Sequence, residues 1–163
     1  MARAQLIGLA IGLVASAAAA QVQDRAQNRT VLGANEFLTA GAEQIRVGEY
    51  DEGIRLTNLG LREVASVGER SAALSNLCAA YAAKGNPDRA IDYCTQSIVL
   101  KESNWRAYSN RSYAFYLKGL YKKAHDDLEI AASINPEARQ IAKIRGMINE
   151  RSLQPSVIME DHR

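Results

Sequence analysis

A chain of 163 residues is long enough to form one domain with a hydrophobic core and too short for two. Its composition, with 47% hydrophobic and 23% charged residues, is that of an ordinary globular protein. The formal net charge of +2 is small, and basic and acidic residues are interspersed, which excludes the basic face that nucleic acid or an anionic membrane would require.

The N-terminal residues have the composition of a bacterial secretory signal peptide. An uncharged run over residues 6–20 ends in alanines, which are the small residues that signal peptidase accepts. This run of about 15 residues is shorter than the ~20 that a helix needs to cross a bilayer, so an uncleaved membrane anchor is disfavoured. Residues 1–20 are predicted to be removed between Ala20 and Gln21. The mature protein is then expected to be periplasmic or secreted, with no stable membrane insertion and a flexible arm at residues 21–33.

Beyond this arm the sequence repeats itself with a period of 34 residues, a length typical of helical-hairpin repeats. Residues 71–104 align with residues 105–138, and residues 34–67 align more weakly, with a slip of three residues. The paired positions in the two better units are Leu74 and Tyr108, Tyr81 and Phe115, Gly85 and Gly119, Ala90 and Ala124, Cys94 and Leu128, and Leu100 and Ile134.

Each unit is predicted to form two helices. The segment SAALSNLCAAYAAK, beginning at residue 71, places apolar residues at helical spacing on one face. Gly85 suits a left-handed cap at its end, Asn86 suits the N-cap of the next helix, and Pro87 suits that helix's first position. Asn135 and Pro136 stop the corresponding helix of the next unit. Since no strand pattern is present, the sequence predicts an all-α fold.

These positions resemble the consensus of the tetratricopeptide repeat family. The matching residues of the third unit are Tyr108, Phe115, Gly119, Tyr121, Ala124, Leu128, Ala131 and Pro136. The resemblance implies an α-solenoid over residues 34–152, built from three hairpins at about 34–67, 71–104 and 105–138. Residues 139–152 carry an isoleucine stripe that suits a C-terminal capping helix, and residues 153–163 are expected to be a flexible tail.

The two cysteines of the chain lie eight residues on either side of Asn86. In an antiparallel hairpin, residues equidistant from the turn lie at the same level, so Cys78 and Cys94 could approach closely enough for a structural disulfide. An oxidising compartment favours this pairing over two reduced, buried thiols, although both remain possible. A zinc site is disfavoured because His125 and His162 are distant and lack partners, and a redox centre because there is no C-x-x-C motif.

No catalytic motif, phosphate-binding glycine loop or cluster of metal ligands is present in the sequence. The sequence His125-Asp126-Asp127 is the nearest to a polar cluster, and both aspartates are expected to face solvent on a helix. The chain is therefore predicted to be non-enzymatic, with no cofactor, no metal and no small-molecule substrate.

In the tetratricopeptide repeat family, the first helix of each repeat lines a concave groove that receives a protein or peptide partner. By repeat position the resemblance places Asn76, Arg106, Asn110, Tyr113 and Tyr116 on that groove. Asparagine can donate to and accept from a peptide backbone, and arginine can pair with a carboxylate. The alternatives are that the asparagines are ordinary solvated helix residues and that the two tyrosines pack against the C-terminal cap.

The function predicted from the sequence is that of an exported, non-catalytic adaptor or assembly scaffold. Two alternatives of other classes remain: a thiol-redox protein that uses Cys78 and Cys94, and a structural subunit of an envelope complex that binds through its convex face.

Overall fold

The computed structural model of the chain describes residues 35–64 and 66–153. The predicted signal peptide, the N-terminal arm, His162 and all of the predicted tail except residue 153 lie outside the described residues. Within those residues, no helix is both long enough and apolar enough to span a membrane.

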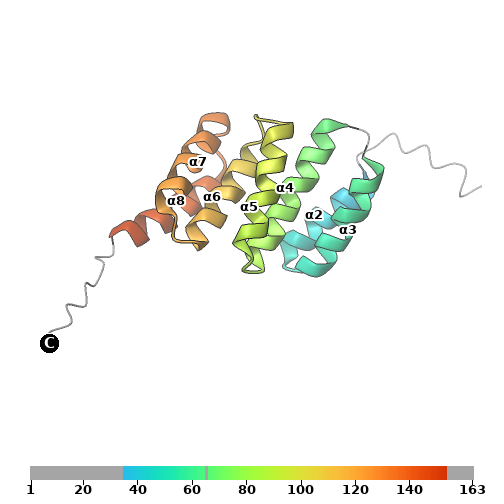
Figure 1. Ribbon diagram of the computed structural model, residues 1–163, viewed down its shortest axis with the longest axis horizontal. Coiled ribbons are helices and arrows are strands. Elements are labelled where there is room, and N and C mark those ends of the chain that lie inside the picture. The colour runs from blue at the N-terminus through green and yellow to red at the C-terminus, as the bar shows by residue number, and fades with distance from the viewer. Residues whose placement is uncertain (1–34, 65, 154–163) are drawn as a thin grey trace, which may run out of the picture. The chain divides into compact units, whose positions relative to one another are not determined.

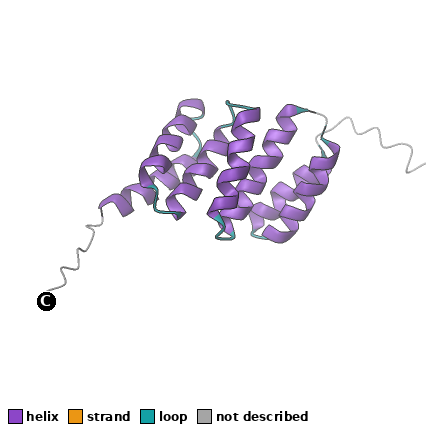
Figure 2. Ribbon diagram, viewed as in Figure 1, coloured by secondary structure: helices purple, strands orange, loops and turns teal. Residues whose placement is uncertain are grey.

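The described residues form seven helices and no strand, so the predicted all-α class is confirmed (Figures 1 and 2). In chain order the helices are α2 (Glu36–Val47), α3 (Tyr50–Glu63), α4 (Val67–Ala83), α5 (Pro87–Leu100), α6 (Trp105–Leu117), α7 (Tyr121–Ile134) and α8 (Arg139–Leu153).

The helices pair as antiparallel hairpins that stack side by side, as an α-solenoid requires (Figure 1). Helix α2 packs on α3, α4 on α5, and α6 on α7. The first helices of successive hairpins also contact each other, and α8 packs on both α6 and α7. One row of the solenoid is therefore α2, α4, α6 and α8, and the other row is α3, α5 and α7.

The turns within the hairpins form where the sequence predicts them. Gly85 and Gly119 have φ angles of 75° and 72°, a left-handed conformation that strains any residue with a Cβ atom. After Gly85, the Asn86 side chain accepts a hydrogen bond from the Arg89 N–H and Pro87 begins α5. The chain therefore reverses direction over residues 84–87. The hydrogen-bonded C-cap of α4, the N-cap at Asn86 and the proline at the first position of α5 stabilise this turn.

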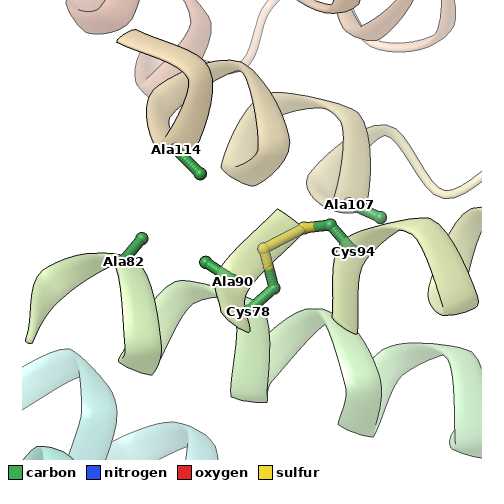
Figure 3. Close-up of a cluster of buried hydrophobic side chains, with 6 residues drawn as sticks. All are labelled: Cys78, Ala82, Ala90, Cys94, Ala107 and Ala114. Atoms are coloured by element: carbon green, nitrogen blue, oxygen red, sulfur yellow. A yellow bond between two sulfur atoms is a disulfide. The ribbon is translucent and has the colours of Figure 1, made fainter. Parts of the chain in front are cut away.

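The core between the second hairpin and α6 is built from small side chains and one disulfide. Cys78 of α4 and Cys94 of α5 are bonded, with a Cα–Cα distance of 5.3 Å, and both are fully buried. Figure 3 shows the disulfide between the two helices of the hairpin, opposite Ala107 and Ala114 of α6. Because alanine leaves room for close helix approach, α6 can lie directly over the sulfur atoms.

Helix α8 closes the end of the apolar core at the third hairpin. Its three isoleucines, Ile141, Ile144 and Ile148, are buried against α7 residues that include Leu128. Over residues 139–151 of α8, no large hydrophobic side chain is exposed to solvent. The helix therefore gives the solenoid the polar end that a stack of repeats needs.

Buried polar groups also connect the hairpins. Ser97 Oγ donates to the Ser71 carbonyl at 2.7 Å, and the Asn104 amide donates to both serine hydroxyls at 3.0 Å. These bonds join α4, α5 and the loop before α6, so they fix the orientation of the third hairpin relative to the second.

The expectation that Asp127 faces solvent is wrong. Asp127 is buried and accepts two hydrogen bonds from Arg111, from Nε at 2.7 Å and from Nη2 at 2.9 Å, and Arg111 also reaches Thr95 of α5. The sequence pattern missed this because the partner comes from the facing helix α6. Asp126 is exposed, as expected, and pairs with Lys122.

Candidate functional site

A groove with a cavity volume of about 540 Å³ runs across the row formed by α2, α4, α6 and α8. Small residues of α4, including Ala79 and Ala82, leave space in its middle. Ile45 of α2 contributes to one side, and Ile144 and Met147 of α8 contribute to the other. The volume lies within the range of pockets that hold a ligand, and the apolar side chains would favour apolar groups.

The charged side chains of the groove are both basic. They are Arg46 of α2 and Lys143 of α8, and none of the described residues that line the groove is acidic. Arg46 donates from Nε to Glu43 at 2.8 Å, and this pairing lowers the pKa of the Glu43 carboxyl. The Lys143 ammonium makes no ion pair or hydrogen bond with the described residues. An anionic group entering the groove would therefore find, at Lys143, a cation that the described residues do not pair.

Asn110 lies at the base of the groove and is already engaged. Its side-chain amide donates to the Ser75 carbonyl at 3.0 Å, and its side-chain carbonyl accepts from Gln140 of α8 at 2.7 Å. The residue is buried rather than an open solvated asparagine. The partner-binding role predicted for Asn110 stays a prediction, and its side chain is held by Ser75 and Gln140.

Asn76 and Arg106 line a different hollow. This second hollow, here called the α6-start pocket, has a volume of about 290 Å³ and is also lined by Lys101, Asn104 and Trp105. The Arg106 guanidinium lies 4.4 Å from the centre of the Trp105 ring. The five predicted site residues therefore do not form one cluster, because Asn110 and Tyr113 line the groove while Asn76 and Arg106 line the α6-start pocket.

The two tyrosines behave differently from each other. Tyr113 lines the groove and also packs against the buried cluster that contains the α8 isoleucines. Tyr116 lines neither hollow. Its ring stacks on Tyr113, with centroids 6.3 Å apart, and lies 5.9 Å from Tyr121. Both tyrosines pack against the cluster that contains the α8 isoleucines, which is the alternative left open by the sequence, and only Tyr113 also lines the groove.

Sequence reasoning missed the contribution of α8 to the groove. Gln140, Lys143, Ile144 and Met147 follow one another at i, i+3, i+4 and i+7, which places them on one face of a helix. The spacing is visible in the sequence, but the isoleucine stripe predicts only a capping helix. It is in the position of a further groove-lining helix, because it contacts α6 as α6 contacts α4.

No group of three or more potential metal-ligating side chains occurs in the described part of the chain. His125 is exposed, with its Nε2 4.0 Å from a Glu129 carboxylate oxygen. Cys78 and Cys94 form a disulfide with each other, so neither has a free thiolate to bind a metal.

Solved tetratricopeptide repeat domains have the same architecture. The second such domain of human RPAP3, solved with the HSP70 peptide SGPTIEEVD, is 22% identical with a TM-score of 0.59, over 71% of this chain and 94% of that one. The tetratricopeptide repeat domain of Arabidopsis OM64 is 18% identical with a TM-score of 0.62, and the match covers 72% of this chain and 96% of that one. The tetratricopeptide repeat domain of Sgt2 from Aspergillus fumigatus is 20% identical with a TM-score of 0.63, and the match covers 73% of this chain and 78% of that one.

At these identities the comparisons establish the fold, and the described residues have the tetratricopeptide repeat fold. No family model matches the chain. No curated protein matches it either.

Proposed function

We propose that this chain is an exported, non-catalytic adaptor that holds a peptide segment of a protein partner in the groove across α2, α4, α6 and α8. The observation that carries the proposal is the lining of the groove, which combines apolar side chains with Arg46 and Lys143 and includes no acidic residue among those described. This chemistry suits a peptide with apolar and acidic side chains.

The comparisons support a ligand of this kind. The RPAP3 domain was solved with SGPTIEEVD, and the first domain of Spaghetti, 22% identical to this chain, was solved with SRMEEVD. Both peptides combine apolar residues with adjacent glutamates. A groove on the same fold, here with basic residues on two of its helices, is compatible with a related ligand chemistry.

Export is supported by two independent features. The first 20 residues have the pattern of a bacterial signal peptide. The Cys78–Cys94 disulfide is of the kind that persists in the periplasm or outside the cell and is rare in reducing compartments. We therefore propose that the protein is periplasmic or secreted.

The thiol-redox alternative is weakened by burial. Thiol–disulfide exchange requires a thiolate to reach one of the sulfur atoms, and both cysteines have 0% exposure. A structural role for this disulfide needs no such access.

A structural subunit that binds through the other row of helices remains the second candidate. Val99 of α5 is 78% exposed and Ile130 of α7 is 41% exposed, so that row presents apolar side chains to solvent. Such side chains could be covered in a larger complex.

The two candidates are separated by a peptide selection on the full mature chain. A random peptide library would be displayed and enriched on the wild-type protein, and binding of the enriched peptides would then be measured to two variants. Ala79→Arg fills the groove, whereas Gln96→Arg adds the same side chain at an exposed position of α5. Loss of binding only with Ala79→Arg supports the groove, and equal binding to both variants contradicts it.

A further inference from the structure

The groove has a candidate occupant within the chain itself. Residues 157–161 read VIMED, three apolar residues followed by two acidic ones, and they come shortly after α8. This composition matches the lining of the groove, where Ile45, Tyr113 and Met147 offer apolar surface and the Lys143 ammonium has no ion pair with any described residue. The likeness is one of chemistry: apolar groups against apolar groups, and carboxylates near ammonium and guanidinium groups.

The covalent geometry allows this segment to reach the groove. Met147 is the last α8 residue that lines the groove, and α8 ends six residues later at Leu153. Six helical residues rise about 9 Å. The four residues from Leu153 to Val157 can span about 13 Å when extended, which is enough to return to the level of Met147. Pro155 cannot continue the helix, so a change of direction at this point is compatible with the sequence.

We propose that residues 157–161 occupy the groove of their own chain, with the apolar residues on Tyr113 and Met147 and with Glu160 and Asp161 near Lys143 and Arg46. The inference rests on the groove of the proposed function. It adds a regulation to that function, because a tethered segment at high effective concentration competes with any partner peptide for the same surface.

Paramagnetic broadening in the full mature chain tests this directly. A His162→Cys substitution places one free thiol beside the segment without changing residues 157–161, since both native cysteines are bonded. With a nitroxide attached there, we expect strong broadening of the amide signals of Ala79, Tyr113 and Lys143. The signals of Val99 and Ile130, on the other row of helices, should be retained. Retained signals on both rows, or equal broadening on both, would overturn the proposal.

A mixed sample separates this arrangement from exchange between copies. Spin-labelled protein without isotope would be added to isotope-enriched protein without the label. Undiminished groove signals in the mixture are expected, because the segment acts within its own chain. Broadening of the groove in the mixture would show that a second copy supplies the segment and would overturn the intramolecular assignment.

Charge exchange supplies the matched control. Lys143→Glu should reduce the broadening of Ala79 and Tyr113, and adding Glu160→Lys and Asp161→Lys to the same chain should restore it. Failure of the restored pair to recover the broadening counts against the proposed contact. None of these measurements uses a partner peptide, so their failure would leave the proposed function standing, and failure of the peptide selection would leave this inference standing.

Discussion

Gln140 of α8 donates a hydrogen bond of 2.7 Å to the side-chain carbonyl of Asn110 in α6, at the base of the groove. The same Asn110 amide donates to Ser75 of α4. A single buried amide thus joins three consecutive helices of the groove-lining row. The capping helix therefore contributes to the shape of the candidate binding surface as well as to the end of the core.

Replacing Asn110 tests this connection. Asn110→Ala removes the hydrogen bonds that this buried side chain makes to Ser75 and Gln140, and we expect a loss of about 1–3 kcal/mol in the free energy of unfolding. Urea denaturation followed by circular dichroism measures it. Asn58→Ala removes an exposed asparagine that bonds only within α3 and should change stability by less than about 0.5 kcal/mol. Equal losses in the two variants would contradict the structural role of Asn110.

The disulfide should contribute strongly to stability. It joins residues 16 apart, and closing a loop of this size stabilises the native state by about 3 kcal/mol on the chain-entropy model. The difference between oxidised and reduced wild-type protein in urea denaturation measures this contribution. A Cys78→Ala, Cys94→Ala variant is the control and should show no response to reductant. If the oxidised and reduced wild-type midpoints coincide, the predicted stabilisation is wrong.

The buried ion pair between Arg111 and Asp127 gives a contrast with an exposed one. Arg111→Ala leaves the Asp127 carboxylate buried without its guanidinium, and we expect a loss of about 3 kcal/mol. Lys122→Ala breaks an exposed pair with Asp126 on the same helix as Asp127 and should cost at most about 1 kcal/mol. Thermal or urea unfolding of both variants measures the two losses in the free energy of unfolding. A larger loss for Lys122→Ala would refute the assignment of Asp127 to the core.

The two hollows can be distinguished by reversing one charge in each. Lys143→Glu places an acidic group in the groove. In a chain that also carries Ile158→Ser and Met159→Ser, so that residues 157–161 do not compete, we expect this change to lower the affinity for an acidic peptide from the selection about fivefold, equivalent to ~1 kcal/mol. Lys101→Glu makes the same change of net charge in the α6-start pocket and should leave the affinity nearly unchanged. Fluorescence anisotropy with the labelled peptide measures both. The opposite ranking would move the site to the pocket that holds Asn76 and Arg106.

Weakening the tethered segment should favour peptide binding. Ile158→Ser combined with Met159→Ser removes apolar contacts of the proposed occupant, so the affinity for the same labelled peptide should rise several-fold because less of the groove is occupied. Val157→Ile keeps the segment apolar and should leave the affinity close to that of wild type. An unchanged affinity in the double variant would show that the segment does not compete.

The sequence by itself was sufficient for the features that depend on local chemistry. The 34-residue period predicted helical hairpins, and Gly85, Asn86 and Pro87 predicted one turn residue by residue, because a positive φ angle, an N-cap and a first helical position each demand a particular residue type. The level of Cys78 and Cys94 in an antiparallel hairpin was readable for the same reason: it depends on helix geometry over only 16 residues.

The tertiary structure decided which side chains share a surface. Asn76 and Asn110 occupy equivalent repeat positions, yet one lines the α6-start pocket and the other is bonded to Gln140 at the base of the groove. Asp127 turned inward because Arg111 faces it from α6. Repeat position determines which way a side chain points on its own helix, whereas its partners come from helices whose packing depends on every neighbouring side chain. The groove has this form because α8 packs beside α6. Helix α8 lies outside the 34-residue repeats, so the repeat pattern does not predict that contact.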